Sequence, residues 1–330
     1  MNISPSISPS AVSPPQDVVA GLESPSLQDL PATVHPALST GQLLSETVTA
    51  LSRDLAQAPG DKVADSQKRD LRLRQSAGLH ALFRETLATP QRQRLDDRQR
   101  DILLDLKSSG LPDANADRVD VGPKASNDFF ARLRDLIDLI KKGYLEVYSH
   151  IIEAYSGFFS AFNDRITAKM KDWIEGANEG KEIKLNVGAL KAALQQLMDD
   201  YSAPPKSVLF PAPGEPGASQ EEAKKWLKAL NLPDSCLLAK KDGSFSVVMD
   251  TTPLSTMLGS LPADGSVTWD TARFQAWQTG FNAQEERMKN TLQSYTQKYS
   301  NANSYHDNFN KTLSSHLSQY ADMLKAMLHF

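Results

Sequence analysis

One seam of apolar and aromatic residues, spaced alternately three and four positions apart, runs through residues 274–327. Positions on this seam include Trp277, Phe281, Leu292, Tyr299, Phe309 and Leu313. No proline follows Pro262, so the sequence allows a single helix about 80 Å long. The spacing is typical of a coiled coil. A helix of that length cannot bury its seam within a compact domain, so we expect a partner helix of similar length.

A second seam runs through residues 126–174 and supplies a candidate partner. Its positions include Phe130, Ile137, Tyr144, Ile151 and Phe158. Proline is absent from 124–203, and Ser126, Asn127 and Asp128 are residue types that cap helix N-termini. The two seams predict an intramolecular antiparallel coiled coil, with helices over 126–174 and 269–330 and a separate domain inserted between them. The alternative is one unrelated helix in each of two globular domains.

Residues 175–268 predict that inserted domain, a small mixed α/β unit. Ile183, Leu185 and Val187 alternate as a strand does, and helical spacing follows from Leu190. Further expected elements are a helix opened by a capping box of Ser219 and Glu222, a hairpin turn at Lys241-Asp242-Gly243, a short helix from Thr252 and a strand over 266–269. The fold predicted for the whole chain is therefore mainly α with a small α+β insert.

The N-terminal third predicts a tail, a helical hairpin and a linker. Residues 1–40 are rich in serine and proline, and the first basic residue is Arg53, so we expect a disordered leader and no Sec signal. Residues 41–110 predict short amphipathic helices, the first with an apolar stripe ending at Pro59-Gly60, then about 62–87 and 91–107. Their stripes, which include Leu71 and Leu82, must pack on each other or on the coil. Residues 111–125 predict a linker.

The sequence shows no constellation for catalysis. It has no glycine-rich phosphate loop, no GxSxG, no HExxH and no CxxC, so we expect no catalytic, metal or cofactor-binding residues and no enzyme. His306 and His316 lie on the seam ten positions apart. They are interpreted either as polar layers that fix the register of the coil or as groups that respond to pH. The net charge of −4 argues against a nucleic-acid partner, and Cys236 is the single cysteine.

Several long segments resemble the invasin-type needle-tip proteins of type III secretion systems, the IpaD/SipD/BipD family, nearest to its SipD and IpaD branch. The matching segments are YLEVYSHIIEAYSGFFSAF (144–162), KLNVGALKAAL (184–194), VLFPA (208–212), KKWLKALNLPDSCL (224–237), TARFQAWQTGF (271–281) and LQSYTQKYSNANSYHDN (292–308). The likeness is strongest over 126–330. It is weaker over 41–110 and only compositional over 1–40.

The resemblance implies a central coiled coil, an N-terminal hairpin packed against it and an α/β insert. It also implies a non-enzymatic protein that is exported through the type III apparatus and forms a small oligomer at the needle tip. There it would sense host contact, regulate secretion and support the translocators in host-cell invasion. The implied partners are the needle subunit, translocator proteins and other copies of the chain. The resemblance further suggests that a small amphipathic host molecule such as a bile salt is a ligand. It assigns no residues of this chain to such a site. In this family the hairpin is thought to act as a self-chaperone.

A needle-contact surface is expected near the C-terminus, where apolar residues exceed what a frayed end needs. The candidates there are Tyr320, Met323, Leu324, Met327, Leu328 and Phe330. Packing on 130–140 is the alternative for Tyr320 and Met323, whereas Leu324, Leu328 and Phe330 lie off the seam. The polar stretch 298–304, with Asn301, Asn303 and Ser304, is the second candidate. Two rival classes stay open: a cytosolic helical scaffold or chaperone, and a hydrolase with its site in the insert.

Overall fold

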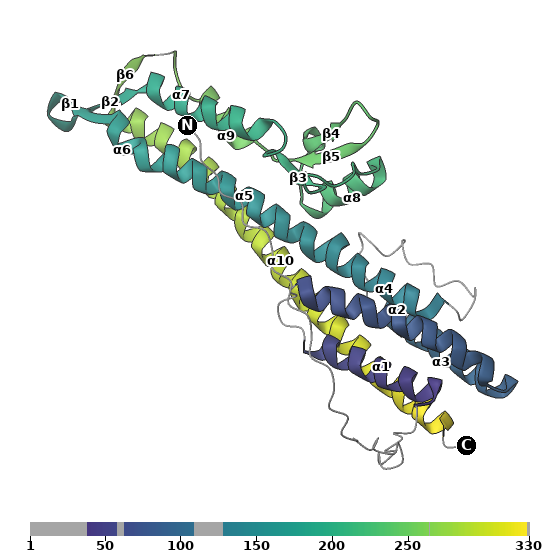
Figure 1. Cartoon of the computed structure of the whole chain (residues 1–330). Helices are drawn as coiled ribbons and strands as arrows, with labels where there is room; N and C mark the ends of the chain where they lie inside the picture. The colour runs from purple at the N-terminus through teal and green to yellow at the C-terminus, as the bar shows by residue number, and fades with distance from the viewer. Residues whose placement is uncertain (1–37, 58–62, 109–127, 264, 329–330) are drawn as a thin grey trace, which may run out of the picture. The chain divides into compact units, whose positions relative to one another are not determined.

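The computed structural model describes residues 38–57, 63–108, 128–263 and 265–328. Its longest element is α10, Thr271–Leu328, a continuous helix of 58 residues. The opposite arm comprises α4 (Phe129–Ile140), a π-helical segment (Lys141–Leu145) and α5 (Glu146–Arg165). Figure 1 shows α5 and α4 running along α10. Residues 1–37 of the predicted leader (1–40) and the predicted linker (111–125) lie outside the described residues, and Thr40 already belongs to a helix.

Aromatic pairs fix the direction of the two arms. Phe162 stacks with Phe281 at 6.4 Å between ring centroids, and Tyr155 meets Tyr295 at 5.2 Å. Farther along, Tyr144 meets Tyr305 at 6.1 Å and Phe129 meets Tyr320 at 5.5 Å. Residue numbers fall along one arm as they rise along the other. The predicted antiparallel coiled coil is therefore confirmed.

The π-helical segment changes which residues face the partner. The buried positions are Ile137 and Ile140 before it and Tyr148, Ile151 and Tyr155 after it. Tyr144, which the spacing places on the seam, is only half-buried within the segment itself. A π-helical turn holds more residues than an α-helical turn, so it rotates the apolar stripe by about one position. Trp277, Leu292 and Tyr299 on α10 are also half-buried.

The insert follows the end of this arm. A 3₁₀ turn at Thr167–Lys169 and the short α6 (Met170–Trp173) lead into β1 (Ile174–Ala177), so the helix predicted to reach 174 gives way to a strand there. β1, β2 (Glu182–Asn186) and β6 (Ser266–Asp270) form one antiparallel sheet. β3 (Val208–Phe210), β5 (Phe245–Val248) and β4 (Leu237–Ala239) form the other. Helices α7 (Val187–Ser202), α8 (Gln220–Ala229) and α9 (Thr252–Gly259) pack beside them.

The turn and cap signals of the insert formed as the residues predict, but two strands were not predicted. The β4–β5 hairpin pairs Leu238 with Ser246 across the turn at Gly243, whose φ of 81° suits glycine. The Ser219 side chain accepts a hydrogen bond from the Glu222 amide and so caps α8. Strands β1 and β3 were not predicted, because each is too short to show an alternating pattern.

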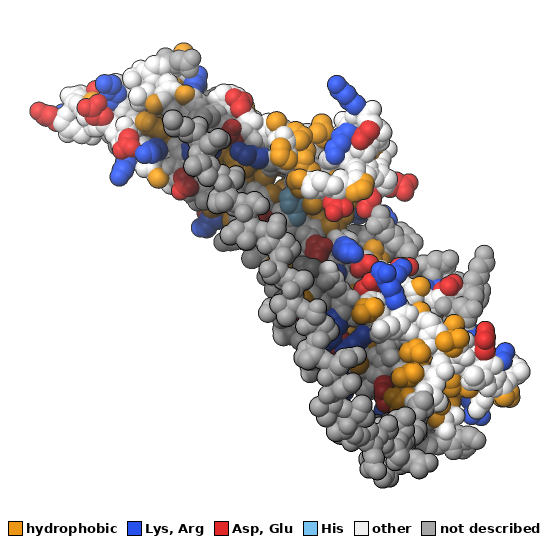
Figure 2. Space-filling model, viewed as in Figure 1, with side chains coloured by type: hydrophobic (Ala, Val, Ile, Leu, Met, Phe, Trp, Pro, Cys, Tyr) orange, Lys and Arg blue, Asp and Glu red, His pale blue; other side chains and the backbone are white. Residues whose placement is uncertain are grey.

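The N-terminal hairpin is built from α1 (Thr40–Ala56), α2 (Val63–Thr86) and α3 (Thr89–Ser108). A complete capping box of Ser39 and Gln42 starts α1. Leu71 and Leu82, expected on the packed stripe of α2, are 55% and 59% exposed, whereas Leu73 and Phe83 are buried. Figure 2 shows hydrophobic side chains at the surface over these helices.

Two hydrophobic cores lie along the coil. One joins α5, the insert and the first half of α10. The other joins α4, the hairpin helices and the second half of α10, from Phe309 to Leu324. The hairpin therefore shares its core with the C-terminal half of the longest helix. This shared core contains Tyr320 and Leu324, and Met323, Met327 and Leu328 pack against it. No helix in the described part of the chain is long and apolar enough to cross a membrane.

Candidate partner-binding surface on the C-terminal half of α10

The C-terminal apolar residues lie under the hairpin. Tyr320 and Leu324 are fully buried, and Met323, Met327 and Leu328 are half-buried against the same core. The expectation that Leu324 faces a partner is wrong for this conformation, because α1 covers that side of α10. Phe330 lies outside the described residues. Figure 1 shows α1 beside the C-terminal end of α10.

Small residues let α1 approach α10 closely. A Cβ atom added at Gly41 would lie 2.5 Å from Leu328 Cδ2 and 2.6 Å from Phe83 Cε2, so a larger residue here would require these two side chains to shift. One turn farther, the Ser45 hydroxyl donates to the Ala321 carbonyl oxygen at 3.1 Å. Glycine and serine four positions apart are the sequence signal for this contact, which was not among the predicted features.

The middle of α1 is joined to α10 by a reciprocal serine pair. Ser52 Oγ donates to the Ser314 carbonyl oxygen at 2.8 Å, and Ser314 Oγ donates to the Ser52 carbonyl oxygen at 2.8 Å. The two hydroxyl oxygens are 3.0 Å apart. Leu44, Val48, Leu51 and Leu55 flank these contacts on α1 and are at most 2% exposed. The α1–α10 contact is therefore a buried helix–helix interface with specific polar positions.

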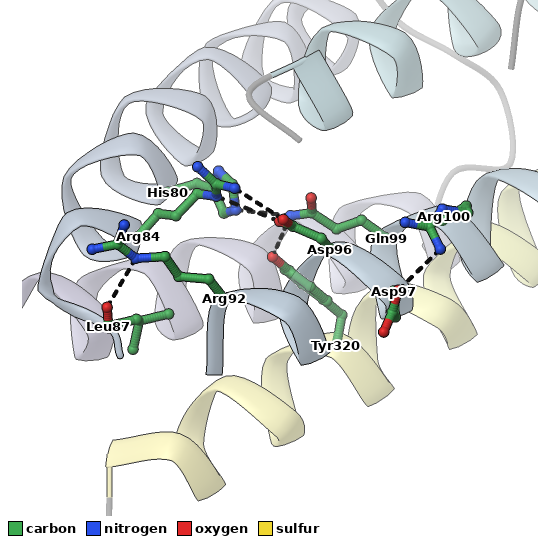
Figure 3. Close-up of polar contacts among 9 residues, drawn as sticks. All are labelled: His80, Arg84, Leu87, Arg92, Asp96, Asp97, Gln99, Arg100 and Tyr320. Atoms are coloured by element: carbon green, nitrogen blue, oxygen red, sulfur yellow. Dashed lines mark hydrogen bonds and ion pairs between the residues drawn. The ribbon is translucent and has the colours of Figure 1, made fainter. Parts of the chain in front are cut away.

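A buried polar cluster joins α2, α3 and α10 (Figure 3). Gln99 Nε2 lies 2.8 Å from His80 Nε2 and donates to Tyr320 Oη at 2.7 Å. The His80, Gln99 and Tyr320 side chains are 1%, 2% and 0% exposed. Arg84 on α2 forms an ion pair with Asp96 on α3 at 2.9 Å beside them. The Tyr320 side chain on α10 therefore joins the hairpin to the coil by a hydrogen bond.

Burial governs the protonation of this cluster. The pKa of His80 is lowered to about 4, chiefly by burial and then by the neighbouring Arg84 charge, against a smaller opposite effect of Asp96. Burial also raises the pKa of Tyr320 above its usual range. At neutral pH, His80 is therefore an uncharged ring that accepts a hydrogen bond from Gln99. Its ring also meets Phe130 edge-on, with centroids 5.9 Å apart.

The second predicted surface, 298–304, remains accessible. Asn301, Asn303 and Ser304 are exposed, and Gln297 Nε2 donates to Asn301 Oδ1 at 2.9 Å along the helix. The stretch lies where the two cores meet. Just beyond it, His306 and Asn310 are 5% and 4% exposed, with Asn310 Nδ2 3.2 Å from His306 Nε2. These two residues form a polar layer inside the seam.

The described residues contain no group of three or more His, Cys, Asp or Glu side chains that could hold a metal ion. In the insert, Cys236 is buried, and burial raises its pKa to about 11. A thiol with that pKa is a poor nucleophile at neutral pH.

The architecture of this protein is thus a long antiparallel coiled coil with an α/β domain inserted between its two arms and a helical hairpin packed over one end. The chain belongs to the family of type III secretion systems tip complex components, whose family model matches residues 23–328. It is 45% identical to the cell invasion protein SipD of Salmonella typhi over 199 residues, 58% of each chain. It is 39% identical to the invasin IpaD of Shigella flexneri over 207 residues, 62% of this chain and 60% of that one. The predicted family is confirmed.

A solved structure supports the fold. The crystal structure of the Pathogenicity island 1 effector protein from Chromobacterium violaceum matches with a TM-score of 0.60 and 32% identity, over 86% of this chain and 93% of that chain. The alignments to the curated relatives are shorter, and the chain spans about 58–60% of the length of the relatives that it matches.

Proposed function

We propose that this protein caps the needle of a type III secretion system as a small oligomer, senses host contact, regulates secretion and supports translocon assembly during host-cell invasion. Its partners would be the needle subunit, translocator proteins and other copies of the chain. It would be exported through the apparatus and lie at the bacterial surface on the needle. Membership of the tip-complex family and the likeness to invasion proteins support this role.

The observation that carries the mechanism is the burial of Tyr320 and Leu324 beneath the hairpin. We infer that the hairpin acts as a self-chaperone, covering the C-terminal half of α10 until assembly. Each fully buried leucine or valine of α1 contributes about 1.5–3 kcal/mol to the covered state. The hairpin would therefore dissociate from α10 only when a partner covers the same residues with a comparable apolar surface. A helical needle subunit or a second tip protein has suitable chemistry.

A reversible covalent lock tests this mechanism. In a Cys236→Ala background, Ser52→Cys and Ser314→Cys place two thiols where the hydroxyl oxygens are 3.0 Å apart. The sulfur atoms need to approach by only about 1 Å to form a disulfide of about 2.05 Å. The oxidised protein should remain a monomer and fail to decorate purified needles. Adding reductant should restore needle binding to the level of the background protein.

The control is a disulfide that leaves the hairpin free. Glu175 and Lys184 are opposed on β1 and β2, so Glu175→Cys with Lys184→Cys crosslinks the insert alone. This oxidised control should decorate needles normally. Normal needle binding by the oxidised Ser52–Ser314 variant would show that the hairpin need not leave.

The rival class, a cytosolic scaffold or chaperone, makes a different prediction about location. A tip protein should appear in the culture supernatant only when the type III apparatus is intact. Fractionating matched cultures with and without a functional apparatus distinguishes the two classes. Retention in the cell pellet under secretion-inducing conditions would favour the scaffold.

A further inference from the structure

One face of α2 carries apolar side chains that the fold leaves uncovered. Leu71 and Leu82 are 55% and 59% exposed, whereas Leu73 and Phe83 of the same helix belong to the core that the hairpin shares with α10. Figure 2 shows hydrophobic side chains at the surface over the hairpin helices. Exposed apolar residues that line up on one helix face are typical of an interaction surface.

The exposed positions of this face follow heptad spacing. Alternate steps of three and four positions connect six exposed residues, which are Lys68, Leu71, Gln75, Gly78, Leu82 and Glu85. We call these six residues the α2 stripe. The stripe spans about 25 Å along the helix. Its spacing is that of one helix of a coiled coil, in which a second helix covers the seam.

Gly78 lies near the middle of the α2 stripe and suits the close approach of another helix. A Cβ atom added at Gly78 would meet nothing within 4 Å, so packing within this chain does not require a glycine there. Glycine inside an exposed helix is unfavourable relative to alanine. A long side chain of a second helix, placed across from Gly78, would account for this residue, because glycine leaves room for a close approach.

The α2 stripe is complementary to a second copy of itself that runs in the opposite direction. The pairs Lys68 and Glu85, Leu71 and Leu82, and Gln75 and Gly78 all have the same midpoint, between residues 76 and 77. A two-fold axis at this midpoint therefore places each residue of one stripe across from its pair on the other. Every contact occurs twice, as in other interfaces with two-fold symmetry.

We propose that the α2 stripe is a surface for a second copy of this chain, paired helix to helix in an antiparallel dimer with two-fold symmetry. Charge complementarity selects this orientation. An antiparallel pair joins the Lys68 ammonium group to the Glu85 carboxylate at both ends, whereas a parallel pair would place like charges together. Apolar contact between Leu71 and Leu82 lies just inside these charges on each side.

This dimer is distinct from the oligomer proposed at the needle tip. The α2 stripe faces away from the core of the hairpin, so pairing leaves α1 docked on α10. The dimer therefore joins chains in which the C-terminal half of α10 is still covered. The contact is short, so we expect pairing to be weak and reversible, at concentrations above those where the chain is a monomer.

Sedimentation velocity of the full chain at increasing concentrations measures this pairing. Leu71→Asp and Leu82→Asp should each abolish it, because a carboxylate would then lie in the apolar contact. Leu104→Asp is the matched control, because Leu104 is 48% exposed on α3 and lies outside the α2 stripe. This variant should pair as the unmodified chain does. All three positions are exposed, so the melting temperature should stay unchanged.

Charge reversal tests the orientation. Lys68→Glu or Glu85→Lys replaces two attractive pairs of the dimer by repulsive ones, so each variant alone should pair about tenfold more weakly. Mixed in equal amounts, the two variants should regain the affinity of the unmodified chain, because each new side chain then faces an opposite charge. Within the chain, Lys68 contacts Asp54 at 3.3 Å, and Arg72 also contacts Asp54, so Lys68→Glu leaves that carboxylate with a partner.

The proposal is overturned if the unmodified chain shows no association, or if Leu71→Asp pairs as strongly as Leu104→Asp. It is also overturned if the mixture of the two charge variants associates no more tightly than either variant alone. A mixture that associates more tightly than the unmodified chain would indicate parallel helices and so contradict the antiparallel dimer. All these measurements are made without needles, so their outcome is independent of the tip function.

Discussion

Ser52 and Ser314 each donate a hydrogen bond from the side chain to the other residue's backbone carbonyl oxygen. Serine and threonine hydroxyls in helices usually bond within their own helix, as the Thr47 hydroxyl does to the Leu43 carbonyl oxygen at 2.7 Å. Here the bonds cross between α1 and α10, so they specify one register of two apolar helices. The hairpin is therefore held at a defined position on the coil, and changes at its close contacts should release it.

The first prediction concerns the closest approach of α1 to the end of α10. Gly41→Val adds a side chain that Leu328 and Phe83 must move to accommodate, so it should destabilise the docked hairpin by about 1–3 kcal/mol. Gly78→Ala is the control, because its Cβ would meet nothing within 4 Å. Thermal unfolding should show a lower melting temperature for Gly41→Val only. Equal melting temperatures for the two variants would mean that the close contact is not formed in solution.

The second prediction concerns pH. His80 has a pKa of about 4 in the docked hairpin, whereas an exposed histidine has a pKa of 6.5. The unfolded or undocked state thus binds more protons between these values, so stability is complete above pH 6.5 and falls as pH drops toward 4. The loss is up to about 3 kcal/mol. Half-buried His316, whose pKa burial also lowers, contributes in the same direction.

Denaturant unfolding at pH 7, 6 and 5 measures this effect. His80→Gln keeps a polar side chain at the cluster but cannot titrate, so its stability should change less over this range. His316→Gln provides the comparison for a less buried histidine. A pH dependence in His80→Gln as steep as that of the unmodified chain would place the titrating groups elsewhere.

The sequence patterns predicted which faces are apolar, but not what covers them. The seams at Ile151 and Phe281 specified the coiled coil because an apolar repeat of this length has few other solutions. The π-helical segment moved burial from Tyr144 to Tyr148, and no propensity signals such a turn. Leu324 lies off the seam, so it was assigned to an external partner, yet α1 covers it. An unpaired apolar face looks the same in sequence whether its partner is internal or external.

The third prediction compares two positions of the coil. Ile151 is fully buried, so Ile151→Asp should cost about 3–5 kcal/mol by placing an unpaired carboxylate in the core. Leu292 is half-buried, so the carboxylate of Leu292→Asp can reach water and should cost less. Thermal unfolding of both variants, followed by circular dichroism, measures which of the two loses more stability. A larger loss for Leu292→Asp would contradict the burial seen here.

The last prediction concerns the chain without its hairpin. Removing residues 1–110 uncovers the side of α10 on which α1 packs, a stripe that includes Leu317, Ala321 and Leu324, all buried in the full chain. The first core, between α5, the insert and α10, is untouched, so the fragment should stay helical. Exposed apolar stripes of this kind promote association. The truncated fragment should therefore self-associate at concentrations where the full chain is a monomer.

Sedimentation velocity over a common range of concentrations measures this association. Adding Leu317→Asp and Leu324→Asp to the truncated chain supplies the control, because two carboxylates in the stripe should restore the monomer. A truncated protein that remains monomeric without these substitutions would remove the basis for a covering role of the hairpin. Association that persists with them would place the self-association surface elsewhere on the coil, with the exposed stretch 298–304 the next surface to test.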